Sequence, residues 1–381
     1  MKKVILLIAI VFCCFKFSYS QSGKLDSSFG TNGIVTTNFE SLPGLSQFRS
    51  TAVQADGKVV AGGITTIGSK SYLVLARYNT DGSLDKSFSG DGKVTVDSFS
   101  SVSSTPVSLA LQKDEKIVVA ASAIFRFNTD GSLDITFSGD GMENISFGSA
   151  RDQSQSLAIQ KDGKIVVGGT TFNETNNSND FSVARYNTDG SVDNTFSGDG
   201  KLKTDISKLS IVSDDNTQSI MIQSDGKIVL AGNSTAKQYD PEDSSIYFTL
   251  YYYTLVRYNI DGTLDNNFNG NGILTSAVTY ESGETATTYV RSTALQDDGK
   301  ILVASTIIDV PGLIRYNKDG SVDNDFGPYG QGYTNLPFSY GRLTNHEDLP
   351  ISVQSDGKIV TGSAQIIYSS SSYSYSVDFK R

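Results

Sequence analysis

The chain has 381 residues and a formal net charge of −10, with 41 acidic against 31 basic residues. No basic run offsets this charge, which argues against nucleic acid or anionic lipid as a partner. Cysteine occurs only at Cys13 and Cys14, and histidine only at His346, so multi-histidine metal centres are excluded.

The first 20 residues predict a cleaved secretory signal peptide. Lys2 and Lys3 precede an apolar run over residues 4–15, and small residues precede Gln21. The run is shorter than the ~20 residues that span a bilayer, and no second run follows, so we expect no transmembrane segment. A lipoprotein anchored at Cys14 is an alternative, although the residues before it fit lipidation poorly.

The mature chain is then 21–381, with no cysteine for disulfides or a thiolate nucleophile. Its net charge is about −13, from 28 basic and 41 acidic residues. We expect a secreted or cell-surface location, with the periplasm as an alternative.

Two motifs alternate down the mature chain. The first, RYNTDGSLDKSFSGDG (77–92), returns at 126–141, 185–200, 257–272 and 315–330, with a headless copy, GKLDSSFGTNG, at 23–33. The second, VQADGKVVAGG (53–63), returns at 111–121, 159–169, 222–232, 295–305 and 353–363. Asp-Gly between β-branched runs is a strong β-hairpin signal, because glycine supplies the positive φ of a primed turn. Glu115 replaces this glycine in the second copy.

One repeat of about 59 residues predicts four antiparallel strands. In the first full unit we expect them at 51–54, 58–63, 72–78 and 93–97, each rich in Val, Ile and Tyr and bounded by turn residues. Four-stranded units in radial repetition are typical of a β-propeller. The predicted fold class is therefore all-β, a six-bladed β-propeller with four antiparallel strands per blade, in one domain over 21–381.

The phase of the repeats predicts how the ring closes. The chain stops near the end of a third strand, and the headless copy supplies the corner that should follow. We expect Ile34–Phe39 to be the fourth strand of the C-terminal blade, beside strands from 351–381. This pairing would remove an exposed sheet edge.

The repeat resembles the delta-60 repeat family of bacterial secreted β-propeller proteins. The RYNxDGSLDxxFxGDG and QxDGKIVVaG elements carry the resemblance, which covers nearly all of 23–381. It implies a propeller and export from a bacterium. It implies no established activity and carries over no catalytic residue.

The aspartates of the first motif raise the question of calcium. With Gly82 at position 6 of a calcium loop, Asp81 and Asp85 fall on ligand positions, but Arg77 and Phe88 replace the outermost carboxylates. We interpret the motif as a scaffold corner, with an Arg–Asp pair and a packed Phe, and expect no metal; calcium is the alternative. The corner positions are Arg77, Asp81, Asp85 and Phe88, with Arg126 and Phe137, Arg185 and Phe196, Arg257 and Phe268, and Arg315 and Phe326 in the other copies.

Ligand-binding residues are expected on the face opposite these corners, where irregular connections gather. The most individual connection is an insertion at 233–253, although Tyr251–Tyr253 are also consistent with an extended third strand. The candidates are Tyr239, Asp240, Glu242 and Tyr247 in the insertion, Tyr280, Glu281, Glu284 and Tyr289 in a second connection, and Tyr340, Arg342 and His346 in a third. Aromatic rings beside carboxylates suit a sugar or a protein partner.

Three functions stay open. We favour a secreted, monomeric module that binds or adheres to an extracellular glycan or protein. A structural or assembly scaffold without a discrete site is the alternative. A carbohydrate-active enzyme would need Glu281, Glu284, His346 and Glu347 to converge; no nucleophile motif or phosphate-binding loop supports catalysis.

Overall fold

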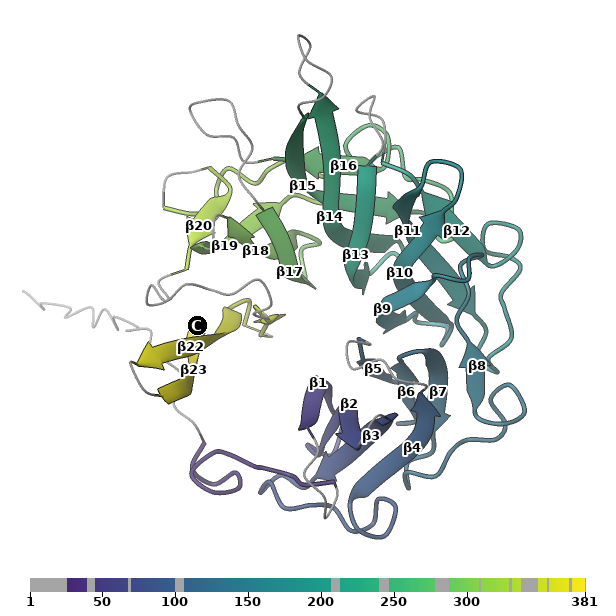
Figure 1. Cartoon of the computed structure of the whole chain (residues 1–381), viewed down its shortest axis with the longest axis vertical. Helices are drawn as coiled ribbons and strands as arrows, with labels where there is room; N and C mark the ends of the chain where they lie inside the picture. Colours follow the sequence, from purple (N-terminus) through teal and green to yellow (C-terminus); the bar gives the residue numbers. More distant parts are fainter. Residues whose placement is uncertain are drawn as a thin grey trace, which may run out of the picture.

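The computed structural model describes residues 26–39, 45–67, 70–99, 106–206, 213–239, 247–277, 288–307, 310–328, 331–336, 349–354, 356–369 and 372–380. Over these ranges the chain is all-β, and its 23 strands form six antiparallel sheets, five of four strands and one of three. Figure 1 shows the sheets following one another around a common centre in chain order. In these ranges no helix is long and apolar enough to cross a membrane.

Each sheet is a meander of consecutive strands. Sheet 1 comprises β1 (Leu45–Val53), β2 (Val59–Ile67), β3 (Lys70–Tyr78) and β4 (Lys93–Phe99). Sheet 2 comprises β5 (Ser108–Leu111), β6 (Ile117–Ala120), β7 (Ala123–Phe127) and β8 (Met142–Asn144). Sheet 3 comprises β9 (Gln153–Ile159), β10 (Ile165–Asn173), β11 (Ser178–Tyr186) and β12 (Lys201–Thr204).

The second half continues the pattern. Sheet 4 comprises β13 (Ser213–Ile222), β14 (Ile228–Tyr239), β15 (Tyr247–Tyr258) and β16 (Ile273–Ser276). Sheet 5 comprises β17 (Thr288–Leu295), β18 (Ile301–Ile307), β19 (Val310–Tyr316) and β20 (Tyr333–Asn335). Sheet 6 comprises β21 (Ile351–Val353), β22 (Ile359–Ser369) and β23 (Ser372–Lys380). All four strands of sheet 1 are longer than predicted because pairing continues past the motif residues.

The turn between the first and second strands needs a left-handed residue. Gly57 in sheet 1 has a φ of +83°. In sheet 2 Glu115 takes the same place with a φ of +63°, so this turn keeps the predicted positive φ although it lacks glycine.

The hydrophobic core lies between successive sheets. Val60, Leu73 and Leu75 of sheet 1 pack with Ile117 and Phe125 of sheet 2 in one buried cluster. Further clusters join sheets 2 and 3, 3 and 4, and 4 and 5. Sheets 2, 3 and 4 therefore each bury both of their faces, as expected for radially stacked units.

The prediction of a strand over Ile34–Phe39 is wrong. Ile34 forms only an isolated bridge with Thr31, residues 35–39 have no strand, and sheet 6 has three strands among its described residues. The segment instead docks on sheet 1, because Phe29, Val35 and Phe39 pack against Tyr78 and its neighbours.

This docking copies the contact between neighbouring sheets. The Gly30 N–H donates to the Asp81 carbonyl at 2.7 Å, as the Ser89 N–H donates to the Asp130 carbonyl at 2.7 Å one sheet further on.

A second contact repeats in the same way. The hydroxyls of Thr37 and Tyr78 lie 2.5 Å apart, and those of Thr204 in β12 and Tyr258 in β15 lie 2.7 Å apart. The N-terminal segment thus lies against sheet 1 where β12 lies against sheet 4.

Candidate functional site

The corner motif is built around a buried ion triplet. In sheet 1 the Arg77 Nε donates to Asp85 Oδ2 at 2.7 Å, and Lys58 Nζ lies 3.1 Å from the same oxygen. In sheets 2 to 5 the corresponding triplets are Arg126–Asp134–Lys116, Arg185–Asp193–Lys164, Arg257–Asp265–Lys227 and Arg315–Asp323–Lys300. Arg77 therefore pairs with Asp85 rather than with Asp81.

The triplets of sheets 1 to 4 also join their sheet to the next one. The guanidinium of Arg185 lies 4.7 Å above the ring of Phe196, and its NH1 donates to the Ile260 carbonyl of sheet 4 at 2.5 Å. Phe196 is fully buried and fills the space that a Cβ on Gly262 of sheet 4 would need. The corner is thus a repeated inter-sheet joint.

The other calcium-loop candidates are engaged in turn hydrogen bonds. Asp81 Oδ1 accepts from the Ser83 N–H at 2.9 Å and from the Ser83 hydroxyl at 2.6 Å. Asn79 Nδ2 donates to the same hydroxyl at 3.0 Å. These contacts form an Asx turn, which accounts for the acidic residues without a metal.

The corner aspartates are held ionised. Burial alone would raise the pKa of Asp85, but hydrogen bonds from Ser87 and Lys58 and the charge of Arg77 hold it well below its ordinary value. The pKa values of Asp134, Asp193 and Asp265 are lowered by the same balance.

In each of sheets 1 to 5 the lysine after the first turn reaches the corner aspartate, so turn and corner share one end of the sheet, here called the corner face. Lys113 Nζ donates to the Lys161 carbonyl at 2.7 Å, and Lys161 Nζ donates to the Ser224 carbonyl at 2.6 Å. Open depressions of about 500 Å³ and 490 Å³ between sheets 1 and 2 and between sheets 3 and 4 are lined by these same turns. Their repetition marks them as scaffold geometry rather than an individual site.

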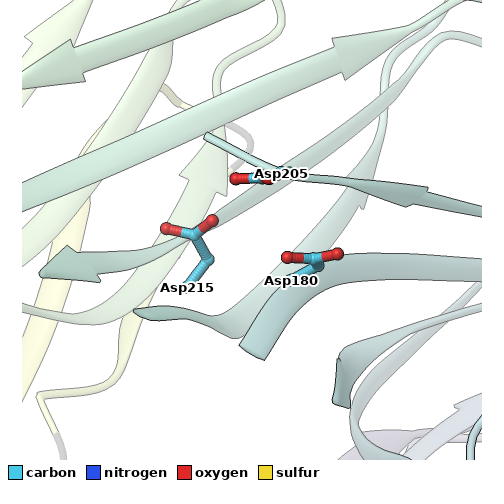
Figure 2. A group of neighbouring side chains, drawn as sticks. All are labelled: Asp180, Asp205 and Asp215. Atoms are coloured by element: carbon cyan, nitrogen blue, oxygen red, sulfur yellow. The ribbon is translucent and has the colours of Figure 1, made fainter. Parts of the chain in front are cut away.

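The opposite ends of the strands form the variable face, where the structure places an acidic cluster. Asp180 lies near the start of β11, Asp205 directly follows β12, and Asp215 lies near the start of β13. One carboxylate oxygen from each lies within 4.8 Å of the others. Figure 2 shows the three carboxyl groups approaching one another from separate segments of sheets 3 and 4.

Protein donors satisfy only part of this cluster. Asp180 Oδ2 accepts from Asn173 Nδ2 at 2.8 Å, and Asp215 Oδ2 accepts from the Ile206 N–H at 3.0 Å. Both side chains are fully buried, and the Oδ1 atom of each has no partner. Asp205 is half-buried and accepts from Asn176 Nδ2 at 3.0 Å.

The electrostatics are opposite to those of the corners. Burial, with a smaller contribution from the Asp205 charge, raises the pKa of Asp215 to about 7. Burial also raises the pKa of Asp180, while Lys203 lowers it. Lys203 is exposed on β12, so the described residues place no buried cation side chain against this cluster.

Of the candidate ligand-binding residues, the structure places few. Tyr239 ends β14 and Tyr247 begins β15, so much of the predicted insertion is a hairpin, with twelve residue pairs against nine in β10–β11. Asp240, Glu242, Tyr280, Glu281, Glu284, Tyr340, Arg342 and His346 lie outside the described residues. Glu347, the remaining enzyme candidate, does too.

Tyr289 is the candidate whose side chain is described. Its half-buried ring lies 6.4 Å from that of Tyr251, edge to face, and the Arg291 guanidinium lies 5.0 Å above it. Tyr251, Tyr252 and Tyr253 all belong to β15. The variable-face ends of sheets 4 and 5 therefore carry an aromatic pair with a cation.

The acidic cluster was missed from the sequence although one signal was present. Asp180 stands five residues before Arg185. The same place holds Tyr72, Ala121, Tyr252 and Val310 in the other copies. An acid at a position that is otherwise apolar or aromatic departs from the repeat, and such departures point to individual rather than scaffold roles.

Comparisons with known proteins concern the fold. A family model described as a domain of unknown function (DUF5122) beta-propeller matches residues 54–88, 112–137, 160–196, 223–243 and 296–326. No curated protein matches the chain significantly.

Similar solved structures are distant. The polysaccharide lyase Uly1 is 8% identical with a TM-score of 0.43, covering 87% of this chain and 89% of its own. An endo-arabinase from Bacteroides thetaiotaomicron is 13% identical with a TM-score of 0.35, covering 73% and 96%. PorZ, a surface component of the type-IX secretion system of Porphyromonas gingivalis, is 10% identical with a TM-score of 0.40, covering 86% and 40%. The family match supports a β-propeller repeat family for this all-β chain, within which the delta-60 assignment stays a prediction.

Proposed function

We propose that the protein is exported and binds an extracellular glycan or protein through its variable face. The observation that carries this proposal is the arrangement of Tyr251, Tyr289 and Arg291 at the ends of β15 and β17. Tyrosine and arginine are enriched where proteins bind partners, since each combines a large contact surface with a polar end. The strands hold these side chains on a rigid support.

A glycan is the ligand class that this arrangement favours. The apolar face of a sugar ring stacks on an aromatic side chain, and nearby polar groups bind its hydroxyls. The long β14–β15 hairpin adds Tyr239 and Tyr247 at the same end of sheet 4. A flat protein surface is the second class that such residues fit.

The test is a binding screen of residues 21–381 against a polysaccharide panel, with Tyr289→Ala, Tyr251→Ala and a deletion of residues 237–245. We expect each change to weaken binding at least about tenfold, or 1.4 kcal/mol. Tyr72→Ala, a half-buried tyrosine of sheet 1, is the matched control and should bind normally. Unchanged affinity in all three variants would refute this location, and failure of every polysaccharide would favour a protein partner or an assembly role.

Export is tested separately, by sequencing the N-terminus of the protein recovered outside the cytoplasm. A mature terminus at Gln21 is expected. An intact Met1 would contradict the proposed signal peptide.

We also propose that the six sheets are the six blades of a closed propeller, with the N-terminal segment completing the last blade. The contacts of Gly30 and Thr37 with sheet 1 support this, because they repeat the contacts between other neighbours. A circular permutant tests it, with residue 381 joined to residue 25 through Tyr-Asn-Thr-Asp-Gly-Ser and new termini opened between β4 and β5. Closure predicts that the permutant folds and is at least as stable as the parent. The proposal is contradicted if the parent unfolds cooperatively and the linked permutant does not.

A further inference from the structure

The acidic cluster between sheets 3 and 4 lacks an internal explanation. Three carboxylates within 4.8 Å repel one another when ionised, and burial of Asp180 and Asp215 removes the solvent that would screen them. A buried charge is tolerated when it is paired or bound to a metal. The exposed Lys203 is a cation that acts on Asp180.

The geometry points to a calcium-binding site formed by Asp180, Asp205 and Asp215. Calcium binds oxygen ligands at about 2.3–2.6 Å, so two oxygens on one ion lie at most about 5 Å apart. The 4.8 Å limit on the three carboxylates fits this span. The unpartnered Oδ1 atoms of Asp180 and Asp215 are the oxygens left for the ion.

Two neutral oxygens lie close to Asp180 in the sequence. Asn176 Oδ1, in the turn between β10 and β11, and Ser178 Oγ, at the start of β11 two residues before Asp180, are buried without a partner. The Asn176 amide already contacts Asp205, and it also acts on Asp180. These atoms bring the donor set towards the six to eight oxygens that calcium takes.

The donor chemistry selects the metal class. All donors are hard oxygens, which exclude the soft-ligand sites of zinc and copper. Magnesium demands near-octahedral geometry and keeps its waters, so a largely buried site suits calcium better.

The site also has a structural consequence. Asp205 and Ile206 end the sheet 3 side of a connection, and Ser213 and Asp215 begin its sheet 4 side. Calcium would therefore tie sheet 3 to sheet 4 on the variable face, where the Arg–Asp corner joints are absent. This inference does not depend on the proposed glycan or protein ligand.

The experiment is thermal unfolding of residues 21–381, stripped with EDTA and then titrated with calcium or magnesium without any glycan. At a calcium concentration 100 times the dissociation constant, we expect Tm to rise by about 3–4 °C, with a smaller rise for magnesium. Asp215→Asn and Asp180→Asn should remove the calcium shift. Asp214→Asn is the matched control, because this exposed neighbour contacts the Asn179 N–H outside the cluster.

The half-buried position of Asp205 gives a milder variant, Asp205→Asn, if the other two do not fold. If only Asp205→Asn folds, loss of the calcium-induced Tm shift in that variant is sufficient to support the site. An equal shift in the parent and the cluster variants, or no shift in the parent between pH 6 and pH 8.5, would overturn it. The second result would mean that a shared proton, rather than calcium, neutralises the carboxylates.

Discussion

The aspartates of the corners and the aspartates of the acidic cluster are both largely buried, but their surroundings and their pKa shifts are opposite. Asp193 on the corner face lies 2.6 Å from Arg185 and 2.8 Å from Lys164, and its pKa is lowered. Asp215 on the variable face has two other carboxyl groups as neighbours, and its pKa is raised. The corner repeats from sheet to sheet, whereas the cluster occurs once among the residues that the structure describes. A repeated, internally neutralised acid belongs to the scaffold, and a single, uncompensated one points to a ligand.

The largest effect is expected from neutralising one member of each group without calcium. Asp193→Asn leaves the buried Arg185 and the half-buried Lys164 without their carboxylate, and removing one partner of a buried pair costs about 3–5 kcal/mol. Asp215→Asn relieves repulsion, so at pH 8 it should stabilise the metal-free protein. Urea unfolding of both variants measures the two free energies. A loss of stability in Asp215→Asn at pH 8 would contradict the repulsion inferred between the cluster carboxylates.

The pH dependence of the same variants sharpens this contrast. Asp215 has a folded pKa raised to about 7 from an ordinary 3.8, so the native state binds its proton more tightly. Without calcium, its contribution to stability is therefore present below pH 4 and lost as the pH rises to about 7. The charged groups that face it are Asp180, Asp205 and, more remotely, Lys203.

The pKa shift of Asp193, and therefore its effect on the pH dependence of stability, has the opposite sign. Its folded pKa is lowered, so its contribution is present above its ordinary pKa and is lost as the pH falls below it. Urea unfolding between pH 3 and pH 9 should therefore show stability falling below about pH 4 and falling again as the pH rises from about 4 to 7. Asp215→Asn should remove only the fall near neutral pH, and an unchanged neutral slope in that variant would contradict the assignment.

The smallest effect is expected at the irregular turn of sheet 2. Glu115 has a φ of +63° where Gly57 has +83°, and a left-handed non-glycine residue costs about 1 kcal/mol. Glu115→Gly should stabilise the protein by about this amount, less any loss of the 3.2 Å contact with Gln54 Nε2. Glu115→Ala removes the carboxylate but keeps the Cβ, so it should show no gain. A lower Tm for the glycine variant would contradict the strain.

The repeated parts of the fold could be predicted from the sequence because the same short-range residue pattern recurs in each repeat. The Asp-Gly turns, the strand periodicity and the pairing of Arg77 follow from short-range patterns. The segment after Gly33 was expected to pair as a strand, but its docking depends on Phe29, Val35 and Phe39 packing on sheet 1, which no local pattern encodes.

The acidic cluster lay beyond prediction for a related reason. Asp180, Asp205 and Asp215 come from three strand ends, and only the stacking of sheets 3 and 4 brings their oxygens together. The aromatic candidates were chosen by composition, and of them Tyr289 has a described side chain that joins a group, with Tyr251 and Arg291.

The most direct test of the account is calorimetric titration of the EDTA-stripped protein with calcium at pH 6 and pH 8.5, in buffers of different ionisation enthalpy. A calcium site at the acidic cluster predicts one calcium ion per chain, with proton release from the cluster at pH 6 that disappears at pH 8.5, where Asp215 is already ionised. No binding at pH 8.5, or binding that Asp215→Asn leaves unchanged, would contradict it.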